Sequence, residues 1–98
     1  MSHSVALTWG APTTGGSVAG YNVKRSTTTG GPYATIGTTT TALTFTDTSA
    51  AVQNEGAHLF YVISATGPGG ESPNSNEFAA TIPFSQPGTP QGLTGVVQ

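Results

Sequence analysis

The stretch at positions 59–65, Leu-Phe-Tyr-Val-Ile-Ser-Ala, constrains the fold of this chain more than any other. Its β-branched and aromatic residues are typical of a strand that is buried on at least one face. Alternate side chains of a strand point to opposite faces, so Leu59, Tyr61 and Ile63 are expected in the core. The single tryptophan, Trp9, is expected to pack over the end of this strand at Ala65. We therefore predict that this stretch is the central strand of a β-sheet domain.

Shorter runs with the same alternation occur along the rest of the chain, and none shows a sustained helical period. Turns rich in glycine, proline and threonine separate these runs. Short strands divided in this way are typical of an antiparallel β-sandwich, and 98 residues suffice for one domain with a single core. The further strands are expected at positions 4–9, 19–25, 33–37, 43–48 and 77–82.

The sparse charge of the chain excludes several classes of function. Charged residues make up 6% of the sequence and the formal net charge is −2, so no basic surface for nucleic acid or an anionic membrane is indicated. Cysteine is absent, which removes disulfides and thiolate metal sites. No apolar run approaches the ~20 residues of a membrane-spanning helix. We therefore expect neither nucleic-acid nor membrane partners.

The ionisable residues are too scattered to predict an active site. The acids lie at a strand end, in a turn, in a loop and at a strand start, so no catalytic carboxylate pair is indicated. His58 could donate a hydrogen bond to Asp47 or Glu55, but a histidine just before a core strand is more typical of a surface position. With two histidines and no acidic cluster, a zinc or calcium site is not expected. We predict no catalytic residue, no cofactor and no metal; the four acids are Asp47, Glu55, Glu71 and Glu77.

An ordered series of short motifs runs along nearly the whole chain: Val5-x-Leu7-x-Trp9, Gly20-Tyr21-x-Val23, Phe45-Thr46-Asp47, the strand ending in Ala65, and Gly70-Glu71-Ser72. Together they resemble a fibronectin type III domain, of the threonine- and glycine-rich type found in tandem in secreted bacterial multidomain proteins. The resemblance implies a seven-stranded antiparallel immunoglobulin-like β-sandwich, located outside the cell or on its surface. One departure is Leu59, which stands where the family has a tyrosine whose hydroxyl braces a corner. We expect that corner to be held differently here.

The C-terminal tail carries a pattern that the family has at its start. Family members begin with a first strand introduced by proline and a Gly-Leu pair, whereas this chain opens on its second strand and has that pattern at positions 87–98. We therefore divide the chain into a domain at 1–83 that begins at its second strand, a Pro/Gly linker at 84–91, and a donated first strand at 92–98.

Three fates of the tail are open: a disordered remnant of a tandem array, docking on its own domain as a circular permutant, or docking on the next molecule. The donor side chains would be Leu93, Val96 and Val97, and the accepting edge would carry Val5 and Leu7. An unpaired strand edge beside an apolar groove makes the disordered form the least favourable. A connector of about nine residues reaches roughly 30 Å when extended, barely the length of the domain, so docking in trans is favoured over docking in cis. Because the donated and accepting surfaces differ, docking in trans would give head-to-tail chains or rings.

Two functions remain for such a chain. The first is a non-catalytic structural spacer or interaction module that contacts neighbouring domains in a tandem array and associates with itself through the C-terminal strand. The alternative is a binding module for a protein or, weakly, for a polysaccharide, through two loops at one end of the sandwich. The loop surface would include Thr13, Thr14, Gly69 and Glu71, but it lacks the aromatic and arginine anchors that usually carry binding energy. We therefore favour the spacer.

Overall fold

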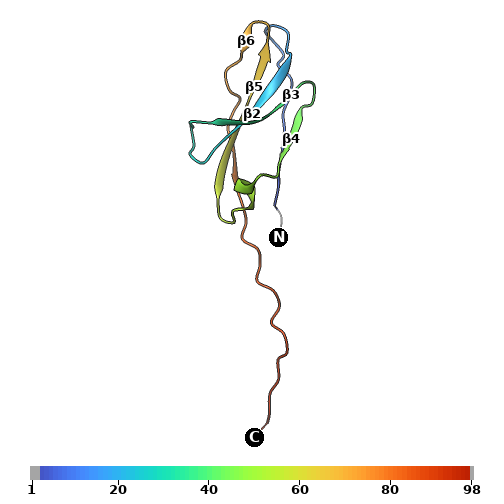
Figure 1. Ribbon diagram of the computed structural model, residues 1–98, viewed down its shortest axis with the longest axis vertical. Helices are drawn as coiled ribbons and strands as arrows, with labels where there is room; N and C mark the ends of the chain where they lie inside the picture. The colour runs from blue at the N-terminus through green and yellow to red at the C-terminus, as the bar shows by residue number, and fades with distance from the viewer. Residues whose placement is uncertain (1–2, 98) are drawn as a thin grey trace.

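The computed structural model describes residues 3–97, and this part of the chain forms two antiparallel sheets (Figure 1). The smaller sheet pairs β1 with β4, and the larger sheet has the order β3-β2-β5-β6, with β7 also paired to β5. The predicted all-β sandwich is confirmed. The elements are β1 (Val5–Thr8), β2 (Gly20–Ser26), β3 (Ala34–Thr39), β4 (Thr44–Asp47), the 3-10 turn η1 (Ala50–Gln53), β5 (His58–Gly67), β6 (Gly70–Glu71) and β7 (Phe78–Thr81).

β5 is the central strand that the sequence predicts. It pairs with β2 along residues 60–66 and with β7 along residues 58–61, so it is hydrogen-bonded on both sides. Leu59 and Tyr61, each 1% exposed, enter the core as their alternation predicts, whereas Ile63 is only partly buried. The other face of β5 is covered in part, because Ser64 lies beneath a polar network described below.

The core lies between the two sheets and is closed at one end by η1. Between the strands predicted at 43–48 and 59–65, a 3-10 turn forms at Ala50–Gln53 and buries Val52 completely. The reason is that Val52 is the one large apolar side chain in this polar segment, and a compact turn lets it reach the core. The buried apolar cluster comprises Val5, Leu7, Val23, Val52, Leu59, Tyr61 and Ile82.

Trp9 is less buried than the sequence predicts. It follows the end of β1 and packs edge-on against Tyr21, with ring centroids 5.6 Å apart, but it is only partly buried. The largest fully buried side chain is Tyr61 instead. Trp9 stays only partly buried because it lies at the open side of β1, where no described strand covers it.

A buried carboxylate joins the two sheets. Asp47 of β4 is 3% exposed and accepts hydrogen bonds from the Tyr61 hydroxyl at 2.8 Å and from Arg25 Nη1 at 2.7 Å. Both donors belong to the larger sheet, so the bonds cross the sandwich. The Tyr61 hydroxyl therefore braces the two sheets through Asp47. Tyr61 lies two residues after Leu59, and Leu59 is the residue that stands where the family has a tyrosine.

The seven strands of the described chain are not the seven that the sequence predicts. The short strand β6, which pairs with the end of β5, lies in a stretch expected to be a loop. Residues 92–97, expected to supply the first strand, form no strand in this structure. Figure 1 shows the tail running away from the sandwich, and the longest dimension of the molecule, 81 Å, is more than three times either of the others, 24 and 20 Å.

Candidate functional site

The outer edge of β1 is the candidate site. The backbone amide of Trp9 donates to the carbonyl oxygen of Leu43 at 3.0 Å, which places the hydrogen-bonded pairs of the β1–β4 ladder at odd-numbered residues of β1. Antiparallel ladders alternate, so the N–H and C=O groups of Ala6 and Thr8 point to the opposite edge. No described strand pairs with β1 on that side. These groups can therefore accept another strand.

An apolar groove of about 350 Å³ runs beside this edge. One side of the groove is β1 and the residues that follow it, and the other is formed by β5 and the chain leading into β7. Leu7, predicted as part of the accepting edge, lines the groove, whereas Val5 is buried in the core beside it. The lining residues are Ala6, Leu7, Thr8, Trp9, Gly10, Tyr61, Ile63, Ser75, Asn76 and Phe78.

β7 and the residue after it are buried unevenly. Ile82 is 3% exposed, and Ala80 is partly buried against the core. By strand alternation, Phe78 lies on the same face as Ala80 and Ile82, but it is 51% exposed because it borders the groove. The indole Nε1 of Trp9 is buried and has no hydrogen-bond partner in the part of the chain that the structure describes. In the described part of the chain, the sandwich is thus open along the side that β1 and Phe78 border.

The predicted donor side chains do not close it. Leu93, Val96 and Val97 are 98%, 82% and 99% exposed, and they lie in the extended tail. The circular-permutant arrangement, in which these residues would be buried in their own domain, is therefore not confirmed. Gln98, the last residue of the predicted donor strand, lies outside the described residues.

The root of the tail is held by a contact that the sequence does not indicate. Glu55 Oε1 accepts a hydrogen bond from the backbone amide of Ser85 at 3.1 Å, and Glu55 Oε2 accepts one from the Ser85 hydroxyl. The same carboxylate lies 3.1 Å from Nε2 of His3, which precedes β1. Hydrogen bonds from Ser85, with a further contribution from His3, lower the pKa of Glu55 to about 2. In the sequence Glu55 has the pattern of an isolated acid in a turn, because its partners are 52 and 30 residues away.

The loop surface predicted for ligand binding is partly assembled. Thr14, Gly69 and Glu71 line one hollow, so the two loops do meet at the same end of the sandwich. They approach closely: a Cβ on Gly67 would lie 2.1 Å from the carbonyl oxygen of Ser17, so only glycine fits at position 67. Thr13 is exposed and is not part of the hollow. No aromatic side chain lines it among the described residues.

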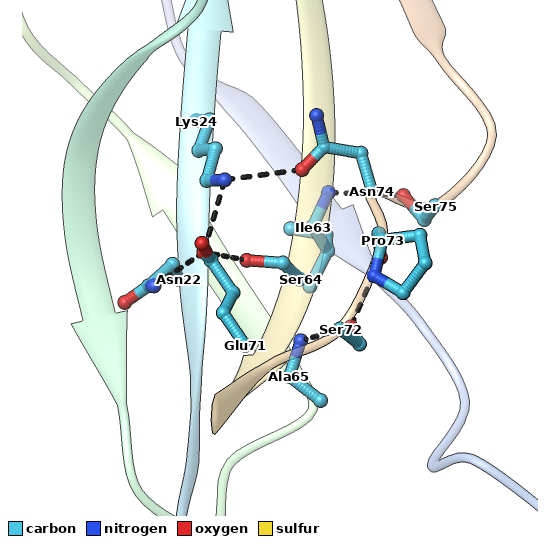
Figure 2. A network of polar contacts seen from close by, with 10 residues as sticks. All are labelled: Asn22, Lys24, Ile63, Ser64, Ala65, Glu71, Ser72, Pro73, Asn74 and Ser75. Atoms are coloured by element: carbon cyan, nitrogen blue, oxygen red, sulfur yellow. Dashed lines mark hydrogen bonds and ion pairs between the residues drawn. The ribbon is translucent and has the colours of Figure 1, made fainter. Parts of the chain in front are cut away.

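The Glu71 carboxylate is bound by side chains of the larger sheet (Figure 2). Its Oε2 accepts hydrogen bonds from Ser64 Oγ and from Asn22 Nδ2 at 2.9 Å, and forms an ion pair with Lys24 Nζ at 3.0 Å. Hydrogen bonds from Ser64, Asn22 and Lys24 lower the pKa of Glu71 to about 2. The carboxylate therefore covers the outer face of β5, and its predicted role in ligand binding has no support in this geometry.

The remaining polar residues do not converge on a reacting centre. His58 is exposed, as the sequence favours, and its Nδ1 lies 3.2 Å from Thr81 Oγ1, so the alternative contact with Asp47 or Glu55 does not form. Glu77 accepts hydrogen bonds from the hydroxyls of Thr29 and Tyr33, which hold the turn before β3. Within residues 3–97 no three histidine or acidic side chains are grouped as metal ligands, and no helix is long and apolar enough to cross a membrane.

Comparison with known proteins identifies the family. No family model and no curated protein sequence matches the chain. Among solved structures, an Fn3-like protein from Clostridium thermocellum is 40% identical, with a TM-score of 0.69, and the match covers 87% of this chain and 82% of that one. This chain belongs to the fibronectin type III family. The twitchin kinase region from C. elegans, 20% identical with a TM-score of 0.71 over 85% of this chain and 14% of that one, shows the same fold. Membership implies a structural or interaction module.

Proposed function

We propose that this fibronectin type III domain is a non-catalytic spacer of an extracellular or cell-surface multidomain protein, and that its copies associate head to tail. In this association, residues 92–98 of one molecule would pair with β1 of the next. The observation that carries the proposal is that one chain contains both an unpaired strand edge beside an apolar groove and an exposed segment with the pattern of a strand.

The donor segment suits the edge in its side-chain pattern. In a strand, Leu93 and Val97 lie on one face with Gly95 between them, and Val96 lies on the other. Leu93 and Val97 would enter the groove beside Leu7, and burying each side chain contributes about 1.5–3 kcal/mol. The small Gly95 leaves room between them for the neighbouring side chains of the groove. The backbone groups of Ala6 and Thr8 would gain the partners they lack.

The absence of catalysis is supported by the use of the acids. Each of the four carboxylates accepts hydrogen bonds within the fold: Asp47 between the sheets, Glu55 at the tail, Glu71 on the outer face of β5, and Glu77 in the turn before β3. A general acid or base has to face a substrate, and these four groups lie at separate places.

Disulfide trapping tests the association directly, because the natural chain contains no cysteine. One protein carries Ala6→Cys, and a second carries either Thr94→Cys or Val96→Cys. Positions 94 and 96 lie on the donor-strand face that points away from the groove, and each of them would lie opposite Ala6 in a different pairing register. Opposed residues of an antiparallel pair have Cα atoms about 4.5–5.5 Å apart, which suits a disulfide. Mixing the two proteins under mild oxidation is expected to give a mixed covalent dimer. Thr38→Cys on β3, at the far edge of the larger sheet, is the matched control for random collision.

Light scattering over a concentration series gives the second measure. The average mass of the wild-type protein should rise with concentration. A constant monomer mass, with no cross-link above the Thr38→Cys control, contradicts the proposal.

The hollow between the two loops supports binding of a polysaccharide as the second candidate function. Affinity electrophoresis in gels containing chitin, cellulose, xylan or starch tests it. Retardation in one of these gels that is lost in the Thr14→Ala variant would favour binding over the spacer function.

A further inference from the structure

We propose that the Glu55 carboxylate directs the donor strand to a neighbouring molecule by fixing the root of the tail beside the start of β1. This inference rests on the proposed function, since it concerns which molecule receives the strand. It makes Glu55 a positioning residue for assembly.

The anchor has two parts. Glu55 binds both the amide and the hydroxyl of Ser85, and it also contacts His3, so the start of the tail and the start of β1 meet at one side chain. Next to it, the ring of Phe84 lies on Gly56: a Cβ at Gly56 would be 2.5 Å from Phe84 Cζ. Gly56 has a φ of +84°, a conformation that favours glycine, so the turn and the ring contact depend on the same residue. Together these contacts set the direction in which the tail leaves the domain (Figure 1).

The anchored tail is too short to reach its own groove in the required direction. Every strand pair in the described structure is antiparallel, so a docked tail has to enter at the Trp9 end of β1 and run toward His3. Between His3 and Trp9 the chain rises about 20 Å. Residues 86–91 extend over at most about 20 Å, and a reversal of direction uses about two of them. Docking in cis is therefore out of reach while Ser85 stays bound.

Releasing the anchor makes docking in cis possible. Ile82, directly after β7, is buried, whereas Phe84 is 77% exposed. Once the contacts of Phe84 and Ser85 are released, the connector begins at Pro83. The three extra residues add about 10 Å, which brings the Trp9 end of β1 within reach. A strand tethered to its own groove experiences a local concentration of the order of millimolar, so docking in cis would then compete strongly with docking in trans.

Two variants test the inference by different routes. Glu55→Ala with Phe84→Ala removes both parts of the anchor, and an insertion of about six glycine and serine residues between Gln86 and Pro87 keeps the anchor but lengthens the connector by about 20 Å. Thr89→Ala, in the linker and away from Glu55, is the matched control. Light scattering measures mass against concentration, and hydrogen exchange at the amides of Ala6 and Thr8 reports whether the groove is filled.

We expect both variants to need at least about tenfold higher protein concentration than the wild type for half-maximal assembly, while their Ala6 and Thr8 amides stay protected. Thr89→Ala should behave like the wild type. If both variants assemble like the wild type, the anchor does not select the partner and the inference is wrong. If they are monomeric with unprotected amides at Ala6 and Thr8, the tail does not dock in cis and the inference is also wrong. A wild-type protein that stays monomeric with these amides unprotected overturns the proposed function itself.

Discussion

At the scale of single residues, most of the specific polar contacts join segments that are distant in the sequence. Asp47 Oδ2 accepts hydrogen bonds from Arg25 and from the Tyr61 hydroxyl, and Oδ1 accepts one from the backbone amide of Ser49. Burial raises the pKa of Asp47, but hydrogen bonds from Ser49, Arg25 and Tyr61 outweigh it, and the pKa lies below its ordinary value. The same contact and burial raise the pKa of Tyr61. The brace is thus a charged group held by neutral and cationic donors.

Tyr61→Phe is expected to lower the free energy of unfolding by about 1.5–3 kcal/mol, because it removes a buried hydrogen bond to a charged acceptor without changing the ring. Urea unfolding at neutral pH measures this loss. Tyr21→Phe is the matched control, since Tyr21 is also buried but its hydroxyl has no hydrogen-bond partner among residues 3–97. Equal losses in the two variants would show that the Asp47 contact does not stabilise the fold.

The carboxylates also predict how stability depends on pH. Hydrogen bonds lower the pKa values of Glu55 and Glu71 from 4.5 to about 2 in the folded protein. The unfolded chain therefore binds protons more tightly, so the free energy of unfolding is constant well above pH 4.5 and falls as the pH drops toward 2. Urea midpoints at pH 7, about 4 and about 3 measure the decline, and Glu71→Gln should make it shallower. A midpoint that is unchanged between neutral pH and about pH 3 would contradict this prediction.

At the scale of elements, β1 and β4 form a sheet of only two strands, which is a marginal unit without packing from elsewhere. It is supported by Val5 and Leu7 against the larger sheet. A third strand on the open edge of β1 would add main-chain hydrogen bonds and cover Trp9. The packing of Val5 and Leu7 explains why a sheet of two strands is stable in this sandwich.

Hydrogen exchange distinguishes the backbone amides on the open edge of β1 from those bonded to β4. At low protein concentration the amides of Ala6 and Thr8 should exchange rapidly, whereas the amide of Leu7, bonded to β4, should be protected. At high concentration Ala6 and Thr8 should become protected as the donor strand docks. Leu7 is the internal control. If Ala6 and Thr8 stay unprotected at all concentrations, no strand docks there.

At the scale of the whole molecule, the domain is a compact body from which an extended tail projects at one end (Figure 1). In the proposed association the donated and accepting surfaces differ, so the contact would be head-to-tail and would extend into chains or close into rings. Such an assembly needs no second kind of subunit.

The face of the donor strand determines which substitutions stop assembly. Leu93→Ser with Val97→Ser places two hydroxyls in an apolar groove and is expected to keep the protein monomeric, because neither hydroxyl gains a partner there. Val96→Ser, on the other face of the same strand, is the matched control and should assemble nearly as the wild type does. Light scattering over the same concentration series gives the masses. If Val96→Ser prevents assembly as strongly as the double variant, the predicted facing of the strand is wrong.

The sequence by itself determined the class of fold and the central strand. Alternation in Leu59–Tyr61 and in Val5–Leu7 marks which side chains enter the core, because a period of two reports the two faces of a strand without any knowledge of its partners. The meeting of the two loops at one end is what the resemblance to the fibronectin type III family implies. The tail pattern is also visible in the sequence, because the family has the same proline and Gly-Leu lead-in before its first strand.

The tertiary structure alone decided how completely each of these residues is buried and which distant groups meet. Trp9 and Phe78 have the pattern of core residues but stay partly exposed, since burial depends on a neighbouring strand and not on the side chain itself. The contact of Glu55 with His3 and Ser85 spans almost the whole chain, and hydrogen-bond geometry between such segments exists only after the sheets have packed. No local sequence pattern predicts a contact between residues so far apart in the chain. A single acid in a turn looks the same in the sequence whether its carboxylate faces water or binds two distant segments.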